Sequence, residues 1–420
     1  MSHLTYHRHR RLRHPIAVPA SSALPRALQV IAWSRTVRWI GWGFGESLIP
    51  IFIFSFSRTY AEAGLIRSVF EIVLLICLPI AGVLADRIPA RTLVLAGLVV
   101  YPLVGVGYLL AGVTGFALFL VLARIANAVG WSLESTGVDT YYRRMAPHRS
   151  MSSSFGFIDT LAGSGWVVAA LIGMLLVPFV PIHYLLFLVA PTSILAYIIA
   201  AWAPHDPPRS GTQPPGTNSV MQSYRLMLTE WRMWGGNLRL LGALSFFVGI
   251  IEALIWFFIP IDAYVEGAKL SLVILLTVVA SIPPMFGYAV GKIADRRNPY
   301  TLIAAGLVGT AALLILIAIF PHHIFFKLVA SFSLGVLLEL FAVIEKGLVT
   351  TLGPSATYGR RGGAFASIGD LGDIAAPLIL GVTLDTIGFP GIASIVAVIA
   401  LIMSGGFALM KSRKPVPLPV

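Results

Sequence analysis

The sequence predicts an all-α membrane protein with about twelve transmembrane helices, arranged as two pseudo-symmetric six-helix bundles. Three observations predict this fold class: an extreme composition, loops that alternate between basic and nearly neutral, and a repeat between the two halves of the chain. Of the 420 residues, 57% are hydrophobic and 11% are charged, whereas about 25% of the residues in an average soluble domain are charged. A soluble core could not bury so much apolar surface, so lipid must surround most of the chain.

Crossing a bilayer takes roughly 20 apolar residues in a helix, and the apolar runs of this chain divide into segments of about that length. In the first half we expect helices near residues 38–56, 64–85, 92–113, 116–137, 153–177 and 184–202. In the second half we expect helices near residues 238–259, 270–290, 300–319, 324–343, 363–384 and 391–410.

Basic residues gather in every second loop and in the two tails, which hold all but five of the 30 Lys and Arg residues. The exceptions are Arg58 and Lys269 in the other loops, Arg67 and Arg124 inside expected helices, and Lys327 near a helix end, where it can snorkel. By the positive-inside rule both termini are cytoplasmic, in a multi-pass protein of the cell (inner or plasma) membrane. The net charge of +12 then reflects topology, and we expect no nucleic-acid partner.

These expectations divide the chain into five parts. They are a basic cytoplasmic N-terminal tail (1–37), an N-terminal bundle (38–203), a cytoplasmic linker (204–236), a C-terminal bundle (237–410) and a cytoplasmic tail (411–420). In the linker, Val220, Tyr224, Leu228, Trp231 and Trp234 recur at helical spacing, which indicates an amphipathic helix on the membrane surface. A calmodulin-like target helix is the alternative reading of that pattern.

The N-terminal tail is rich in His and Arg and contains no acid. We expect it to lie against anionic lipid headgroups; a metal-binding or organelle-targeting segment is the alternative. Cys77 is the one cysteine of the chain, which excludes a disulfide framework and a cysteine metal site.

The first half of the sequence recurs in the second half, in order. Tyr60-Ala-Glu62 recurs as Tyr264-Val-Glu266, Ala85-Asp86-Arg87 as Ala294-Asp295-Arg296, and Ser154-Phe155 as Ala364-Phe365. The separations of about 204 to 210 residues are half the chain length. We infer a duplicated unit, and two parallel repeats are a known transporter architecture.

Two loops in register with this repeat carry a family signature. The loop after the second expected helix reads Gly82-Val-Leu-Ala-Asp86-Arg87-Ile-Pro-Ala-Arg91, and its counterpart reads Gly291-Lys-Ile-Ala-Asp295-Arg296. Both resemble the loop signature of the major facilitator superfamily, G-x-L-A-D-R-x-G-R-K, although Pro89 and Ala90 replace its second Gly and the following Arg. In the fourth helix, Arg124, Asn127 and Gly130 resemble the family pattern L-x3-R-x2-Q-G-x-G. The resemblance covers the whole chain and implies the twelve-span transporter fold.

The resemblance also implies a gating role for these loops. In the family the Asp latches the second helix against the eleventh in the outward-facing state, and the Arg pairs with an acid at the end of the fourth helix. Asp86, Arg87 and Asp139 would fill those places here. A carboxylate can do this because it caps free N–H groups and opposes a positive helix dipole. Topology alone is the alternative explanation for Arg87 and Arg91. The other gating candidates are Gly82, Gly291, Asp295 and Arg296.

Acidic residues lie inside the expected helices. They are Glu46, Glu71, Asp159, Glu252, Glu339, Asp370 and Asp373. Each ionised acid at the bilayer centre costs roughly 2.5–3.5 kcal/mol on insertion scales, so most must face the bundle interior or a wet cavity. Few bases accompany them, so we expect some of these carboxyls to be protonated, and a carboxyl that gains and loses a proton is what proton coupling requires.

The embedded charges differ as candidates for proton or cation coupling. Glu46 leads, because no base is near it on its own helix and the first and seventh helices line the cavity in the resembled family. Glu252 on the seventh helix is second. Arg67 and Glu71 are four residues apart and should pair, so we read Glu71 as structural. Asp159 and Glu339 stay open.

Two further coupling candidates lie on the eleventh helix and one on the fourth. Asp370 and Asp373 share a helix face, so they either couple to protons or hydrogen-bond the backbone of a glycine-rich helix. Arg124 matches the family's fourth-helix Arg, which is associated with proton-coupled members.

Aromatic residues are candidates to line a cavity for a lipophilic or cationic substrate. These are Trp42, Trp166 and Trp256, with packing or an interfacial belt as the alternative. The family's antiporter signature G-x3-G-P-x2-G-G does not occur in the fifth helix. A related pattern around Pro377 in the eleventh helix is explained by a kink.

The sequence therefore predicts a secondary active transporter of a small solute that works by alternating access and is coupled to protons, as an efflux antiporter or a permease. A non-transporting sensor or a membrane enzyme on the same scaffold is the alternative. No P-loop, metal-ligand cluster or nucleophile triad occurs in the sequence, so we expect neither an enzyme nor a metal site. The expected partners are a small-molecule substrate and the bilayer. We expect a monomer with no cofactor, driven by the proton gradient.

Overall fold

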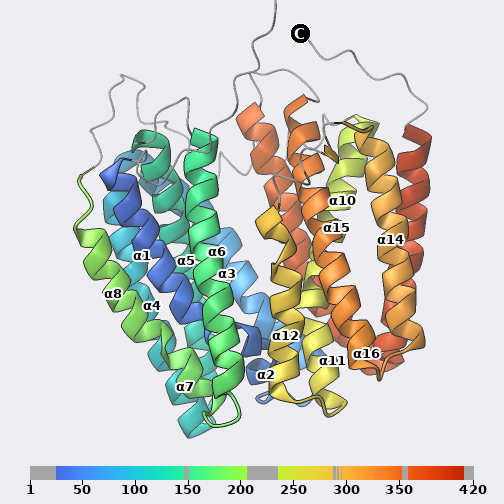
Figure 1. Cartoon of the computed structure of the whole chain (residues 1–420), viewed down its shortest axis with the longest axis horizontal. Helices are drawn as coiled ribbons and strands as arrows, with labels where there is room; N and C mark the ends of the chain where they lie inside the picture. The colour runs from blue at the N-terminus through green and yellow to red at the C-terminus, as the bar shows by residue number, and fades with distance from the viewer. Residues whose placement is uncertain are drawn as a thin grey trace, which may run out of the picture.

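The computed structural model of the protein describes residues 25–145, 151–205, 235–286, 290, 293–294, 296–351 and 358–410. Over these ranges the chain is helical, with no strand. Figure 1 shows the helices running up and down in two groups that lie side by side.

The first group, the N-bundle, comprises the helices before residue 205. They are α1 (Arg26–Gly43), η2 (Glu46–Leu48), α2 (Ile49–Phe54), α3 (Tyr60–Arg87), α4 (Ala90–Thr114), α5 (Ala117–Met145), α6 (Met151–Leu176), α7 (Ile182–Phe187) and α8 (Val189–Ala201). These helices pack mainly against one another.

The second group, the C-bundle, comprises the helices after residue 235. They are α10 (Gly236–Ala253), the π-helical segment η4 (Leu254–Phe258), α11 (Ile259–Val265), α12 (Leu270–Ser281), η5 (Pro283–Phe286), α14 (Pro299–Ile319), α15 (Ile324–Thr351) and α16 (Tyr358–Met410). Within α16, two helices meet at Gly388, where φ is 70° and ψ is 175°.

Among the described residues, nine helices are long and apolar enough to cross a membrane, and α12 is a shorter apolar helix. The fold is therefore an all-α membrane fold. The two ends of the bundles need names. We call the end where α1 begins, α8 ends and α10 begins the linker end, and the end where α2 and α11 lie the loop end; they are at the top and the bottom of Figure 1.

The two bundles meet through α3 with α16, α6 with α12, η2 with α12, and α2 with α11. Figure 1 shows α2 close to α11 and α12 at the loop end. The contact of α3 with α16 depends on a small residue, because a Cβ on Gly64 would lie 2.1 Å from the Pro377 carbonyl oxygen. Small residues allow this close approach of helix backbones inside a membrane.

Several helix boundaries differ from the expectation, and those of α1 and α12 differ most. Helix α1 begins at Arg26, directly after Pro25, so the basic tail does not extend to residue 37. Arg35 and Arg38 made this segment resemble part of the basic tail. In the folded protein each of these arginines lies next to an acid, so both can belong to a membrane helix. Helix α12 ends at Ser281 rather than near residue 290, because the prolines at 283 and 284 cannot donate helical hydrogen bonds. The linker helix expected around residues 220–234 and the tail at 411–420 lie outside the described residues.

Candidate functional site

A cavity of about 890 Å³ lies between the two bundles. Its wall comes from α1, η2, α2, α3, α5 and α6 on one side and from α10, η4, α12 and α16 on the other. Trp42, Trp166 and Trp256 all lie in this wall, as do Trp39 and Trp131. The volume suits an organic molecule, since ligand pockets usually measure about 300–1,000 Å³.

Glu46 lies in the cavity wall at the start of η2, the short 3-10 turn that follows α1. The indole Nε1 of Trp166 donates a hydrogen bond of 2.5 Å to Glu46 Oε2. The indole reaches the carboxylate because α1 and α6 pack together. Hydrogen bonds to an ionised acceptor are short and strong, so Trp166 fixes the direction of this carboxylate.

The C-bundle contributes Glu252 of α10 and Asp373 of α16 to the same wall. Helices α10 and α16 pack together, and Asp373 lies directly against Gly249, one turn before Glu252. Two candidate carboxyls thus come from neighbouring helices. Asp370, the third candidate of this group, is not among the residues that line the cavity.

Glu46 and Glu252 occupy matching places in the two halves. Glu46-Ser-Leu48-Ile49 aligns with Glu252-Ala-Leu254-Ile255 at a separation within the range set by the other repeats. Each glutamate also lies where its helix loses regular α geometry, in η2 and just before η4. The duplication therefore brings one carboxyl from each half to the same cavity.

Three cavity arginines come from the N-bundle. Arg67 pairs with Glu71 at 2.6 Å, as their four-residue spacing predicts, and Arg35 lies 3.7 Å from Asp159. Arg124 lies over the ring of Phe70, with its Cζ 4.5 Å from the ring centroid. Cation–π contacts of this kind are worth roughly 0.5–2 kcal/mol, so Arg124 is held by an aromatic ring and stays in the cavity wall.

A buried ion pair lies behind the aromatic wall. Arg38 Nη2 is 3.2 Å from Glu134 Oε2, and the two side chains are 0% and 2% exposed. The guanidinium of Arg38 also lies 4.9 to 5.2 Å from the ring centroids of Trp39, Tyr101 and Trp131. Sequence reasoning missed this pair because Arg38 was taken as the edge of a basic tail. The apolar residues after Pro25 were the signal that the helix begins earlier.

The loop-signature residues lie at the linker end. Arg91, in the first turn of α4, donates to the carbonyl of Ala201 at the end of α8, and its Nη1 is 2.8 Å from His205 Nε2. Arg91 thus joins two helices of one bundle. Arg87 is exposed and forms no ion pair with Asp139 in the part of the chain that the structure describes.

Other signature residues are only partly described. No described atom lies within 4 Å of a Cβ placed on Gly82, and Arg296 is exposed. Gly291 and Asp295 lie outside the described residues, as does the side chain of Asp86. A latch through Asp86 therefore stays a prediction.

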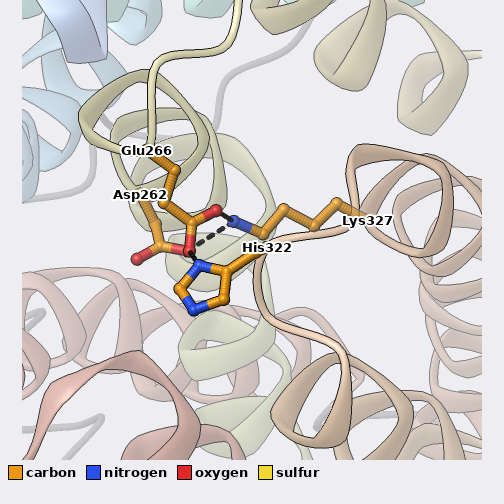
Figure 2. A network of polar contacts seen from close by, with 4 residues as sticks. All are labelled: Asp262, Glu266, His322 and Lys327. Atoms are coloured by element: carbon orange, nitrogen blue, oxygen red, sulfur yellow. Dashed lines mark hydrogen bonds and ion pairs between the residues drawn. The ribbon is translucent and has the colours of Figure 1, made fainter.

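A second charged group, the Lys327 cluster, lies at the loop end of the C-bundle. Figure 2 shows the ammonium of Lys327 pointing toward the carboxylates of Asp262 and Glu266, with the ring of His322 next to them. Lys327 Nζ is 2.7 Å from Asp262 Oδ2 and also bonds Glu266, whose Oε1 is 2.8 Å from His322 Nδ1. The Lys327 side chain is 0% exposed. It does not snorkel, because two acids neutralise it in place.

Known proteins resemble this chain over nearly its whole length. The Quinolone resistance protein NorA of Staphylococcus aureus (strain COL) is 22% identical over 348 residues, which cover 83% of this chain and 87% of that protein. The Probable nitrate/nitrite transporter NarK2 of Mycobacterium tuberculosis (strain CDC 1551 / Oshkosh) is 24% identical over 406 residues, covering 93% and 97%.

Solved structures share the fold. The nucleoside transporter NupG superposes with a TM-score of 0.75 at 14% identity, covering 93% of this chain and all of that one. A D-xylose-proton symporter superposes with a TM-score of 0.71 at 14% identity, covering 93% and 98%.

The helical fold, the cavity between two bundles and these relatives define a membrane transport protein. The chain belongs to the Major Facilitator Superfamily, whose sequence model matches residues 31–377. The family consists of transporters, so its membership confirms that the protein is not an enzyme.

Proposed function

We propose that the protein is a secondary active transporter that moves an organic cation through the central cavity by alternating access, in exchange for protons. The observation that carries this proposal is the excess of carboxyls over bases in a cavity walled by tryptophan. The exchange would use the same carboxyls for the cation and for the protons.

The charged residues of the described cavity wall divide into pairs and a remainder. The acids are Glu46, Glu71, Asp159, Glu252 and Asp373, and the bases are Arg35, Arg67 and Arg124. Two of the arginines face acids, at 2.6 Å and 3.7 Å. Glu46, Glu252 and Asp373 are left facing Arg124 alone. Such a site attracts positive charge, because the field of unbalanced carboxylates is weakly screened in a low-dielectric interior.

The tryptophans favour an aromatic or alkylated cation over a small inorganic ion. Indole is the side chain that binds cations best over its face, and desolvated contacts reach about 2 kcal/mol. Five tryptophans line the cavity, and Trp166 is also the hydrogen-bond donor to Glu46. A cation that displaces a proton from Glu46 would therefore bind next to indole rings that already line the cavity.

The relatives' names support transport and leave the charge of the substrate open. NorA is named for quinolone resistance and NarK2 for nitrate and nitrite, and a D-xylose-proton symporter shares the fold. Nitrate is an anion, and an anion site would need free arginines. Arg35 and Arg67 are paired with acids, and Glu46, Glu252 and Asp373 outnumber the remaining Arg124, which argues against that substrate class here.

The membrane arrangement completes the proposal. We infer twelve crossings: α1 to α2 as the first, α12 as the eighth and the two arms of α16 as the last two. The linker end would be cytoplasmic, since the basic loops lie there, and the protein would work as a monomer in the cell membrane. Asp86, Arg87 and Asp139, with the second signature at Gly291, Asp295 and Arg296, would act when this end closes.

Ethidium uptake into liposomes tests this proposal. The purified protein is reconstituted with DNA fragments trapped inside, so that entering ethidium, an aromatic cation, fluoresces. An acidic interior should drive uptake, because protons leave as ethidium enters. Glu46→Gln should lower the gradient-driven rate by at least about tenfold, since an amide cannot release a proton. Glu62→Gln is the matched control, because Glu62 is exposed and bonds only backbone in its own bundle.

Two other outcomes decide between the alternatives. Carboxyfluorescein, an aromatic anion, and nitrate are offered in parallel assays. Uptake of either anion without ethidium uptake would refute a cationic substrate but would still support a transport function. If the rate of ethidium uptake does not depend on the pH gradient and Glu46→Gln is fully active, proton coupling is refuted.

A further inference from the structure

Between the cavity and the loop end, α3 of the N-bundle packs against α16 of the C-bundle. Ser68 Oγ of α3 donates to the Ile374 carbonyl of α16 at 3.1 Å, and one turn further on Gly64 packs against Pro377. Tyr60, at the start of α3, packs its backbone against Gly381. The two helices therefore run antiparallel from the cavity to the loop end.

Beyond these packing contacts, a charged side chain crosses between the bundles. Asp385 of α16 accepts hydrogen bonds from the backbone N–H of Tyr60 at 2.9 Å and from that of Ala61 at 2.9 Å. Those N–H groups belong to the first turn of α3, where no helical carbonyl can accept them. The side chain of Thr59 accepts from the N–H of Glu62, so Thr59 and Asp385 serve different donors.

We propose that Asp385 is the latch of the loop end: its carboxylate caps α3 of the opposite bundle and holds the cavity closed on this side. The carboxylate also opposes the positive end of the α3 dipole. When the bundles separate here, these N–H groups and the carboxylate pass to water. The proposal rests on the alternating access proposed above, and it adds the residue that sets the balance between the two open states.

The neighbouring charges do not share this role. In the Lys327 cluster, Asp262, Glu266, His322 and Lys327 all belong to the C-bundle. These pairs stay intact when the two bundles move apart, so they stiffen the C-bundle without opposing its movement. Asp385 differs because its partners lie in the other bundle.

An aromatic contact marks the same boundary. The ring centroids of Tyr60 and Phe258 are 6.5 Å apart, and Phe258 belongs to η4 of the C-bundle. Tyr60 thus meets the C-bundle through its ring and through its backbone N–H. Tyr60 is thus one of the residues of α3 through which the two bundles meet at the loop end.

Distances between spin labels test the latch. In a Cys77→Ser background, Phe179→Cys and Lys269→Cys place labels on exposed sites of the N-bundle and the C-bundle at the loop end. Thr92→Cys and Arg239→Cys do the same at the linker end. Double electron–electron resonance in lipid nanodiscs then reports both distances without any substrate.

Asp385→Ala should shift the population toward a longer loop-end distance and a shorter linker-end distance. The equilibrium constant between the two states should change by roughly three- to tenfold, because a helix cap is lost. Asp385→Asn should shift it less, because the amide oxygen still accepts. Thr386→Ala is the matched control: this exposed neighbour bonds only carbonyls of its own helix. An intact gel-filtration profile and unchanged tryptophan fluorescence show that each variant is folded.

Unchanged distances in folded Asp385→Ala would overturn the latch, as would an equal shift in Thr386→Ala. If Asp385→Ala fails to fold, Asp385→Asn decides alone, and distances equal to the parent's overturn the proposal. Transport is measured separately with ethidium. If Asp385→Ala shifts the distances but the parent protein does not transport ethidium, the latch is supported and the proposed function is refuted.

Discussion

Arg38 and Glu134 face each other 3.2 Å apart, with side chains that are 0% and 2% exposed. Two full charges are thus held inside the N-bundle, next to the tryptophans that line the cavity. Burying such a pair costs desolvation that only the partner can offset. The pair therefore stabilises the bundle only as long as both members are present.

Removing one member of this pair should destabilise the protein strongly. Arg38→Met or Glu134→Leu alone leaves an uncompensated buried charge, which costs about 3–5 kcal/mol. The double variant, with two apolar side chains, should regain most of that loss. Thermal unfolding followed by intrinsic tryptophan fluorescence measures this. Equal melting temperatures for the double variant and the worse single variant would contradict the paired role, and Arg239→Met on the exposed surface provides the control.

Trp166→Phe should weaken the function of Glu46 while leaving the cavity's shape nearly intact. The substitution removes the 2.5 Å hydrogen bond to Glu46 Oε2, and hydrogen bonds to charged groups contribute roughly 1.5–3 kcal/mol. We expect gradient-driven ethidium uptake to fall by about tenfold. Trp33→Phe, at a tryptophan that is 54% exposed, should leave uptake unchanged. A similar loss in both variants would point to a general effect of losing indole.

Gly64→Ala and Gly82→Ala should have opposite effects, although both lie in α3. At Gly64 the new Cβ would lie 2.1 Å from the Pro377 carbonyl, whereas no described atom lies within 4 Å of one at Gly82. Overpacking costs about 1–3 kcal/mol, and replacing a helical glycine by alanine otherwise stabilises by about 1 kcal/mol. Melting temperatures in nanodiscs should therefore fall for the first variant and rise slightly for the second. A neutral result at Gly64 would mean that the loop end is not tightly packed.

Lys327→Met should be far more damaging than His322→Ala. Lys327 is 0% exposed and bonds both Asp262 and Glu266, so its loss leaves the buried carboxylate of Asp262 without its cation, at about 3–5 kcal/mol. His322 is 82% exposed, and exposed pairs contribute at most about 1 kcal/mol. Adding Asp262→Asn to Lys327→Met should recover part of the stability in the same melting experiment. Equal effects of the lysine and histidine variants would contradict the burial of this cluster.

Much of the fold and the wall of the cavity could be predicted from the sequence. Runs of apolar residues and the internal repeat identify most helices, and embedded acids such as Glu46, Glu252 and Asp373 do lie in the cavity wall. This succeeds because an unpaired charge has no tolerable place in lipid. The same argument did not separate Asp373 from Asp370, since the direction of a side chain depends on how α16 rotates against α10.

Two of the residues that sequence reasoning missed, Asp262 and Asp385, lie just beyond the expected helix ends. The seventh helix was expected to end near residue 259, but it continues through η4 and α11 to Val265 and so contains Asp262. The eleventh was expected to end one residue before Asp385. Hydropathy falls where charges begin, so it ends each helix too early when those charges are paired across the fold. Only the tertiary contacts show that Asp262 meets Lys327 and that Asp385 meets α3.

The matching places of Glu46 and Glu252 have a consequence for how the site could evolve. Before duplication, one gene supplied that glutamate, and in an assembly of identical copies any mutation at it would have appeared in both. Fusion into a single polypeptide removed this constraint. The first copy now has the Trp166 indole as its neighbour, while the second lies in the wall with Asp373. One inherited carboxyl has thereby become two residues on which selection can act separately.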